Sequence, residues 1–75
     1  MKKSPPSFGQ HLKVLRLNNK FSQEKLAQIT ALDRTYISLL ERDQRQPTLK
    51  TLFRICEAIE IKPSDFISQI ESQES

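Results

Sequence analysis

Two helix-start signals lie close together between residues 22 and 42, and they constrain the fold more than any other feature of the chain. Ser22 and Asp33 each precede a run with apolar residues at helical spacing. A short side-chain oxygen at such a position accepts a hydrogen bond from a free backbone N–H of the first turn. Phe21 and Leu26 add the pattern of a hydrophobic staple around the first cap. Since only about three or four residues separate the two expected helices, the pattern predicts a helix-turn-helix.

The second of these helices, residues 33–42, is expected to keep one side free. With about 100° per residue, Ile37 and Leu40 point to a common buried side. The opposite side carries guanidinium groups, hydroxyls and one aliphatic group, from Arg34, Thr35, Ser38, Leu39 and Arg42. Such groups recognise base edges in the DNA major groove, where Arg pairs with guanine and apolar groups contact the thymine methyl. An ordinary solvated helix face is the alternative, since Arg, Thr and Ser are common surface residues.

Length and composition favour one small all-α domain. The chain has 75 residues, four Pro, one Gly and no alternating β-branched run. No apolar stretch approaches the roughly 18 residues that span a membrane, and the N-terminus lacks a secretory hydrophobic segment. A single Cys cannot form an internal disulfide, so a reducing cytoplasm is the expected location.

The charge of the chain is distributed unevenly. Residues 1–56 contain eleven Lys and Arg against four Asp and Glu, whereas residues 57–75 contain one Lys against five acidic residues. The basic part includes the helix expected over residues 33–42, which favours a polyanionic partner such as duplex DNA. Charged solvated surfaces are also common, so charge alone does not decide between these interpretations.

We divide the chain into a flexible basic tail at 1–6, a helical domain at 7–71 and a frayed end at 72–75. A pair of Pro residues in the tail excludes a helix interior there. Lys2 and Lys3 belong either to a disordered tail or to an arm that touches phosphates.

The remaining helices follow from similar local signals. Ser7 is expected to cap a first helix that ends near residue 18 or 19, and Thr48 a fourth that follows a polar loop at 43–47. Pro63 suits the first turn of a fifth helix that ends near residue 71. In the helix after Ser22, the residues expected to face inward are Leu26, Ala27 and Ile29.

The fourth and fifth helices carry more apolar side chains than a domain of this size is expected to bury. We expect the surplus to form a contact with a second copy of the chain, giving a homodimer. The residues assigned to this contact are Phe53, Ile55, Phe66, Ile67 and Ile70. The alternative is that the fifth helix packs back on the fourth and buries them all.

The residue types give almost no support for an enzyme. One His and one Cys do not make a metal site of the usual kind, and Cys56 has the helical spacing of a small core thiol. The sequence lacks a Gly-rich phosphate loop and a Ser/His/Asp set. We therefore expect no catalytic residue, no metal, no cofactor and no small-molecule ligand.

Residues 8–70 resemble the Cro and phage-repressor family of bacterial helix-turn-helix proteins. The matching segments are Leu12-Lys13-Val14-Leu15-Arg16, Ser22-Gln23-Glu24-Lys25-Leu26-Ala27, Ile37-Ser38-Leu39-Leu40-Glu41-Arg42, Pro47-Thr48-Leu49 and Leu52-Phe53-Arg54-Ile55. Leu32-Asp33-Arg34-Thr35-Tyr36-Ile37-Ser38 is also similar to the recognition segment of restriction–modification controller proteins. The resemblance implies a five-helix, lambda-repressor-like fold, a homodimer and a palindromic DNA operator read by the third helix.

The resemblance and the helix positions together assign roles to individual residues. The residues expected to face bases are Arg34, Thr35, Ser38 and Leu39. Those expected at the DNA backbone, or else merely solvated, are Gln23, Tyr36, Arg42, Gln44, Arg45 and Gln46. An Arg at the position of Arg16 pairs in this family with a Glu at the position of Glu41, which implies a structural ion pair between the first and third helices.

Two positions depart from the family pattern. Ala31 stands where the turn usually has Gly, and a left-handed backbone there would cost roughly 1 kcal/mol. Asp43 stands where Gly often follows the third helix, and it brings a negative charge near the expected DNA backbone. Neither departure argues against the fold.

The sequence therefore predicts a cytoplasmic, nucleoid-associated transcription regulator that binds double-stranded DNA. The rival hypothesis is an antitoxin-like protein-interaction module that holds a partner through the fourth and fifth helices. A salt-sensitive gel shift on duplex DNA by the isolated chain would distinguish the two.

Overall fold

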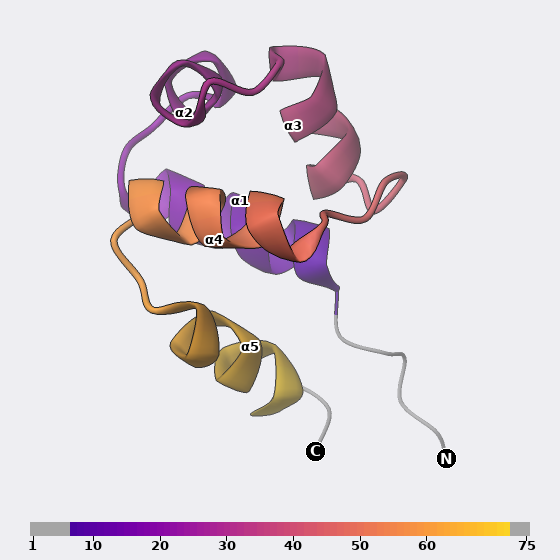
Figure 1. Cartoon of the computed structure of the whole chain (residues 1–75), viewed down its shortest axis with the longest axis vertical. Helices are drawn as coiled ribbons and strands as arrows, with labels where there is room; N and C mark the ends of the chain where they lie inside the picture. Colours follow the sequence, from indigo (N-terminus) through magenta and orange to yellow (C-terminus); the bar gives the residue numbers. More distant parts are fainter. Residues whose placement is uncertain (1–6, 73–75) are drawn as a thin grey trace.

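Five helices form the regular structure of this computed structural model, which describes residues 7–72 (Figure 1). In chain order they are α1 (Phe8–Asn18), α2 (Gln23–Thr30), α3 (Arg34–Glu41), α4 (Leu49–Ala58) and α5 (Pro63–Ser72). No strand occurs among residues 7–72, so the predicted all-α, five-helix fold is confirmed. The expectations for the tail at 1–6 and for the last three residues lie outside the described residues.

The first four helices begin where the sequence predicts. Their N-caps are Ser7, Ser22, Asp33 and Thr48. Each cap oxygen accepts a hydrogen bond, at 2.9–3.1 Å, from a backbone N–H two or three residues further along the chain. Helices of 8–11 residues are marginal alone, so their stability depends on packing against one another.

Each of the same four helices is followed, within two residues, by a left-handed residue that is not Gly. These residues are Lys20, Ala31, Asp43 and Glu60, with φ between 57° and 61°. In each case the N–H of the next residue bonds, at 2.9–3.1 Å, to a carbonyl five residues earlier, which is the Schellman geometry. Three of the next residues, Phe21, Leu32 and Ile61, are apolar and pack partly against the core. At these three ends the structure therefore has the apolar contact that often accompanies a Schellman motif.

We predict that Ala31→Gly stabilises the domain. Ala31 is exposed at φ 60°, where a Cβ costs roughly 1–2 kcal/mol, and the greater freedom of Gly in the unfolded chain offsets part of that gain. The net increase should be about 0.5–1 kcal/mol, which raises Tm by roughly 2–8 °C for a domain of this size. Thermal unfolding followed by circular dichroism measures it. Gln28→Gly, in the exposed interior of α2, should instead lower Tm; a lower Tm for Ala31→Gly would contradict the prediction.

One core joins all five helices. Its buried members are Leu12, Leu26, Ala27, Ile37, Leu40, Leu52, Ile55, Cys56, Ile59 and Phe66. α3 packs against α1 and α2, and α4 packs against α2 and α5. Burial raises the pKa of the Cys56 thiol to about 11, which fits a core residue rather than a nucleophile.

The inward side of α2 differs from the prediction at one residue. Ile29 is exposed, whereas Thr30 is buried and its hydroxyl donates to the Leu26 carbonyl at 2.7 Å. The hydroxyl satisfies its own hydrogen bond within the helix, so a polar residue is tolerated at this position. The expectation that Ile29 faces inward is therefore wrong.

The only Gly of the chain lies where two helices meet. Gly9 is buried in the first turn of α1. A Cβ added there would lie 2.2 Å from the Leu40 carbonyl oxygen and 2.5 Å from that of Glu41. The absence of a side chain therefore lets the start of α1 lie directly against the last turn of α3.

α5 lies at the end of the molecule opposite α2 and α3 (Figure 1). Its Phe66 ring packs against two rings of α1, with centroid distances of 5.3 Å to Phe8 and 5.0 Å to His11. His11 Nε2 also lies 2.7 Å from Gln69 Oε1. These contacts hold α5 against α1 and leave α3 uncovered.

The expected dimer contact is wrong at two of its five residues. Ile55 and Phe66 are 0% exposed because they fill the core of their own domain, so they do not reach a second copy. Phe53 and Ile67 are exposed, at 52% and 44%, and Ile70 is partly buried. The apolar pattern did not show which residues of α4 and α5 the domain itself buries, and a contact of the exposed ones with a second copy stays a prediction.

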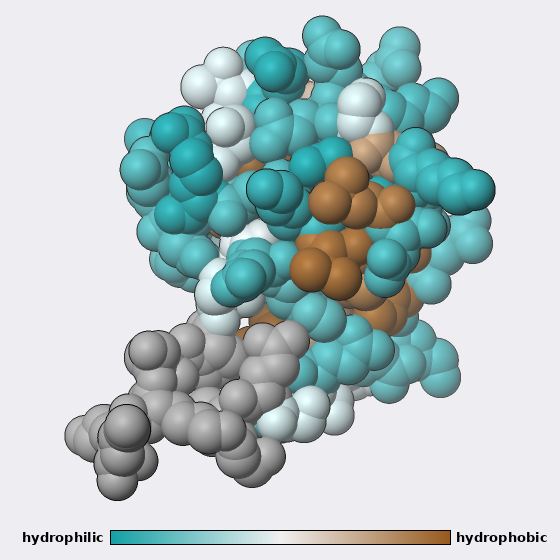
Figure 2. Space-filling view, turned by 180° about the vertical axis from the view of Figure 1, so that it is seen from behind, coloured by the Kyte–Doolittle hydropathy of each residue, from teal (hydrophilic) through white to brown (hydrophobic). Residues whose placement is uncertain are grey.

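The face seen from behind is mainly hydrophilic, with a small hydrophobic patch (Figure 2). α1 lies on this face, and its large exposed apolar residues are Val14 and Leu17. Exposed apolar residues in such small numbers are common on globular domains. None of the helices in residues 7–72 is long and apolar enough to cross a membrane.

Candidate nucleic-acid interface

α3 presents its outer side to solvent, as the helical wheel predicts. Ile37 and Leu40 are fully buried, which fixes the rotation of the helix. Arg34 and Thr35 are exposed on the outer side, and the other two predicted base-facing residues, Ser38 and Leu39, are partly buried. α5 lies at the other end of the molecule and leaves this side open (Figure 1).

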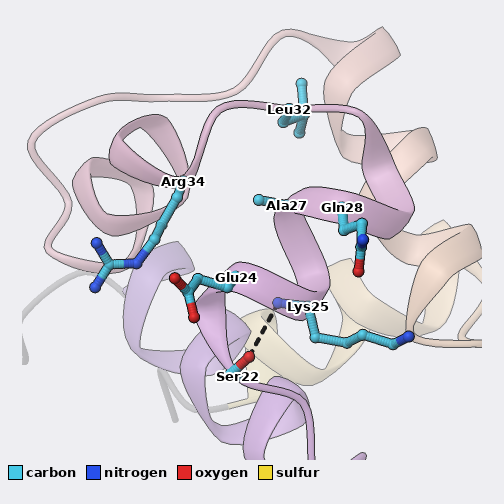
Figure 3. Close-up of a pocket in the computed structure, with 7 residues that line it drawn as sticks. All are labelled: Ser22, Glu24, Lys25, Ala27, Gln28, Leu32 and Arg34. Carbon is cyan, nitrogen blue, oxygen red and sulfur yellow. Dashed lines mark hydrogen bonds between the residues drawn. The ribbon is translucent and has the colours of Figure 1, made fainter.

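Arg34 lies at the edge of a shallow hollow between α2 and the start of α3 (Figure 3). The hollow is lined by Ser22, Glu24, Lys25, Ala27, Gln28, Leu32 and Arg34. Among residues 7–72, no side chain forms a hydrogen bond or an ion pair with the Arg34 guanidinium. Because a guanidinium carries five N–H donors, the full bidentate geometry is available to an external acceptor.

The ion pair expected between Arg16 and Glu41 is present and buried. Arg16 donates from Nε to Glu41 Oε2 at 2.6 Å and from Nη2 to Oε1 at 3.1 Å. The two side chains are only 8% and 3% exposed. Arg16 Nη1 also donates to the Phe21 carbonyl at 2.7 Å, so one guanidinium fastens α1 to α3 and to the loop before α2.

Gln23 has an internal partner that the sequence did not reveal. Its Nε2 donates to Glu41 Oε1 at 3.0 Å, which joins the first residue of α2 to the buried ion pair. The amide group has a second N–H, and the backbone N–H groups of the first turn of α2 also point outward from the helix end. The contact of Gln23 with a phosphate stays a prediction.

The other residues expected at the DNA backbone border α3. Tyr36 is partly buried and packs against the core. Arg42 is exposed at the end of α3, with Nε 3.4 Å from the Ser38 carbonyl. Gln44, Arg45 and Gln46 are exposed in the loop before α4. These residues thus lie within α3 or in the segment that directly follows it.

The carboxylate of Asp43 is turned toward α1. It accepts a hydrogen bond from Gly9 N at 2.9 Å and another from the Ser7 hydroxyl. The sequence analysis noted its negative charge but missed this partner, because Asp43 lies 34 positions after Gly9. One local feature was consistent with this contact. The first turn of α1 has no acidic residue of its own, although a negative charge is favourable at a helix N-terminus.

Within residues 7–72, no group of three or more His, Cys, Asp or Glu residues is arranged to hold a metal ion. Every buried side-chain nitrogen or oxygen in this part of the chain has a hydrogen-bond partner. The polar groups in this part of the chain that can meet an external partner are therefore exposed ones, and those around α3 are among them.

Known proteins resemble this chain in sequence and in structure. Residues 12–66 match the helix-turn-helix family. Control protein C.BamHI of Bacillus amyloliquefaciens is 41% identical over 61 residues, which are 80% of this chain and 75% of that protein. The immunity repressor of Bacillus phage phi105 is 34% identical, but the matched region spans only 44% of it. The crystal structure of the restriction–modification controller protein C.AhdI from Aeromonas hydrophila has a TM-score of 0.77 and 38% identity, covering 80% of this chain and 91% of that one.

Proposed function

This chain belongs to the helix-turn-helix family of DNA-binding transcription regulators, which are not enzymes, and we propose that it acts as a homodimer on a palindromic operator. The proposal depends above all on the uncovered outer side of α3, where Arg34 has no partner among residues 7–72. Two α3 helices about 34 Å apart would enter successive major grooves on one face of the duplex.

The side chains of α3 and of the segments beside it have two roles in DNA binding. Arg34, Thr35, Ser38 and Leu39 contact base edges, with a bidentate contact from Arg34 to guanine as the main source of preference. The residues that contact the sugar-phosphate backbone are Gln23, Tyr36, Arg42, Gln44, Arg45 and Gln46. These contacts fix the orientation of the domain without selecting a sequence.

The dimer contact involves the exposed apolar side chains of α4 and α5. These include Leu49 at 65% exposure, which was not among the predicted residues, together with Phe53 and Ile67. An antitoxin-like module would use the same surface for another protein. Relatives that are named control protein and repressor favour the regulator over that alternative.

The same relatives support a narrower role. We place the chain among the control proteins of restriction–modification systems, acting on bacterial DNA in the cytoplasm. The similarity to C.BamHI and to the structure of C.AhdI supports this role.

The proposal is tested by selecting preferred duplexes from a randomised pool with the purified full chain. The wild type should enrich a two-fold symmetric site, and Arg34→Ala should lose preference at one base pair in each half-site. Loss of a bidentate contact of about 1–3 kcal/mol corresponds to a roughly 5–150-fold smaller discrimination there.

Lys62→Ala is the matched control for Arg34→Ala. It removes one positive charge from the exposed connection between α4 and α5, away from α3. It should leave the preferred sequence unchanged. Equal loss of affinity by Arg34→Ala on selected and random duplexes would exclude base recognition by Arg34, and the absence of salt-sensitive binding by the wild type would exclude the whole proposal.

A further inference from the structure

We propose that Asp43 is a positioning residue for DNA binding, because it anchors the loop at 44–46 to the start of α1. The inference rests on the proposed function, in which the exposed side chains of this loop contact the DNA backbone. It explains why an acidic residue occupies a left-handed position so close to an expected polyanion.

The carboxylate belongs to a closed set of hydrogen bonds at the N-terminus of α1. Gly9 N donates to Asp43 Oδ1 at 2.9 Å, and the Ser7 hydroxyl donates to Oδ2. Ser7 Oγ in turn accepts from Gln10 N at 2.9 Å. Asp43 and Ser7 thus share the free N–H groups that begin α1, and Asp43 supplies the anion that the first turn of α1 lacks.

The backbone of Asp43 is held from the other side by α3. Its N–H bonds to the Leu40 carbonyl at 3.1 Å, and the N–H of Gln44 bonds to the Leu39 carbonyl at 2.9 Å. With φ at 58°, this residue turns the chain out of α3. Side chain and backbone are therefore both fixed at the point where the loop begins.

The close approach of two helices makes this anchor possible. The Asp side chain is short, and it reaches the α1 backbone because Gly9 allows that backbone to lie against Leu40 and Glu41. A Gly at position 43 would adopt the left-handed conformation more readily but would leave the loop unattached. We infer that the anchor holds the loop in its binding conformation and lowers the entropy lost when DNA is bound.

The interaction also offsets the charge of Asp43. The positive end of the α1 dipole and two hydrogen-bond donors face the carboxylate. A carboxylate with these partners should repel nearby phosphates less than a solvated one would. The gain in DNA affinity from the anchored loop should therefore exceed the loss from the remaining repulsion.

The chain contains a matched control for a test of Asp43. Glu60 is also acidic, exposed and left-handed, with φ 57°. It follows α4, whereas Asp43 and the loop at 44–46 precede that helix. Asp43→Gly and Glu60→Gly make the same kind of change in backbone freedom and remove the same charge. Loss of the Asp43 charge near DNA would by itself strengthen binding, so weaker binding by Asp43→Gly than by Glu60→Gly reports the anchor.

Binding of both variants is measured on a selected and on a random duplex over a range of salt concentrations, at a temperature where circular dichroism shows them folded. Asp43→Gly should bind both duplexes roughly 3–10-fold more weakly than Glu60→Gly, with a salt slope smaller by about one phosphate contact. Base preference at the Arg34 position should not change. Asp43→Asn, which keeps an acceptor for Gly9 N–H and tolerates a left-handed backbone, should restore most of the affinity.

The free protein gives an independent measurement. Backbone order parameters at 44–46 should fall from about 0.85 toward 0.6 in Asp43→Gly and stay unchanged in Glu60→Gly. Equal affinity and equal order parameters in the two Gly variants would overturn the role of Asp43. If the wild type still bound DNA in that case, the proposed function would be unaffected. If the wild type bound neither duplex, both proposals would fall together.

Discussion

Gly9→Ala is expected to destabilise the domain by about 3 kcal/mol or more, because the added methyl group meets backbone rather than flexible side chains. Its Cβ would lie 2.2 Å from the Leu40 carbonyl oxygen and 2.7 Å from the Glu41 carbonyl carbon. Neither atom can move without breaking the last turn of α3, so α1 itself must shift. That shift would also weaken the hydrogen bond from Gly9 N to Asp43.

Urea unfolding followed by circular dichroism measures the loss. A domain of this length has a total stability of roughly 4–11 kcal/mol, so the variant should lose a large part of it. Gln10→Ala, at the exposed neighbouring position of the same helix, should change stability by no more than about 0.5 kcal/mol. Equal stability of the two variants would show that α1 and α3 are not in close contact at Gly9.

Features that depend on neighbouring residues could be predicted from the sequence. A cap is formed within one turn, so Ser22 and Asp33 identified their helices without knowledge of the rest of the chain. The outer side of α3 was predictable for a related reason. Ile37 and Leu40 are fully buried, and two buried positions suffice to fix the rotation of a short helix.

Contacts between distant residues were not predictable from residue patterns. The hydrogen bond from Gln23 to Glu41 and that from Gly9 to Asp43 join residues 18 and 34 positions apart, and no local pattern marks either pair. The ion pair between Arg16 and Glu41 joins residues 25 positions apart, and it was foreseen mainly through the resemblance to a known family.

The errors at the dimer contact have a different cause. Hydrophobicity shows that a residue avoids water, but it does not show whether its own domain or another copy covers it. Phe66 is buried because α1 contributes the rings of Phe8 and His11 to its surroundings. Ile55 faces the same core from α4. The packing of α5 against α1 accounts for the burial of Phe66, whereas Ile55 and the exposed Phe53 differ in the side of α4 on which they lie.

Glu41→Ala is expected to cost about 3–5 kcal/mol, because it leaves the Arg16 guanidinium buried without its counter-charge. The Arg16 side chain is only 8% exposed and has bonds from Nε and Nη2 to the lost carboxylate, at 2.6 and 3.1 Å. Its remaining bond to the Phe21 carbonyl does not neutralise the charge. Urea unfolding at constant pH and salt measures the loss.

Replacing both partners separates the cost of an unpaired charge from the worth of the pair. The double variant Arg16→Met with Glu41→Leu removes both charges and keeps apolar volume, so it should be less destabilised than Glu41→Ala. Its loss should come mainly from the unpaired Phe21 carbonyl and Gln23 amide, about 1–3 kcal/mol for each group that water does not reach. A double variant less stable than Glu41→Ala would contradict this prediction. The attraction within the ion pair would then contribute more to stability than the cost of burying Arg16 without a counter-charge.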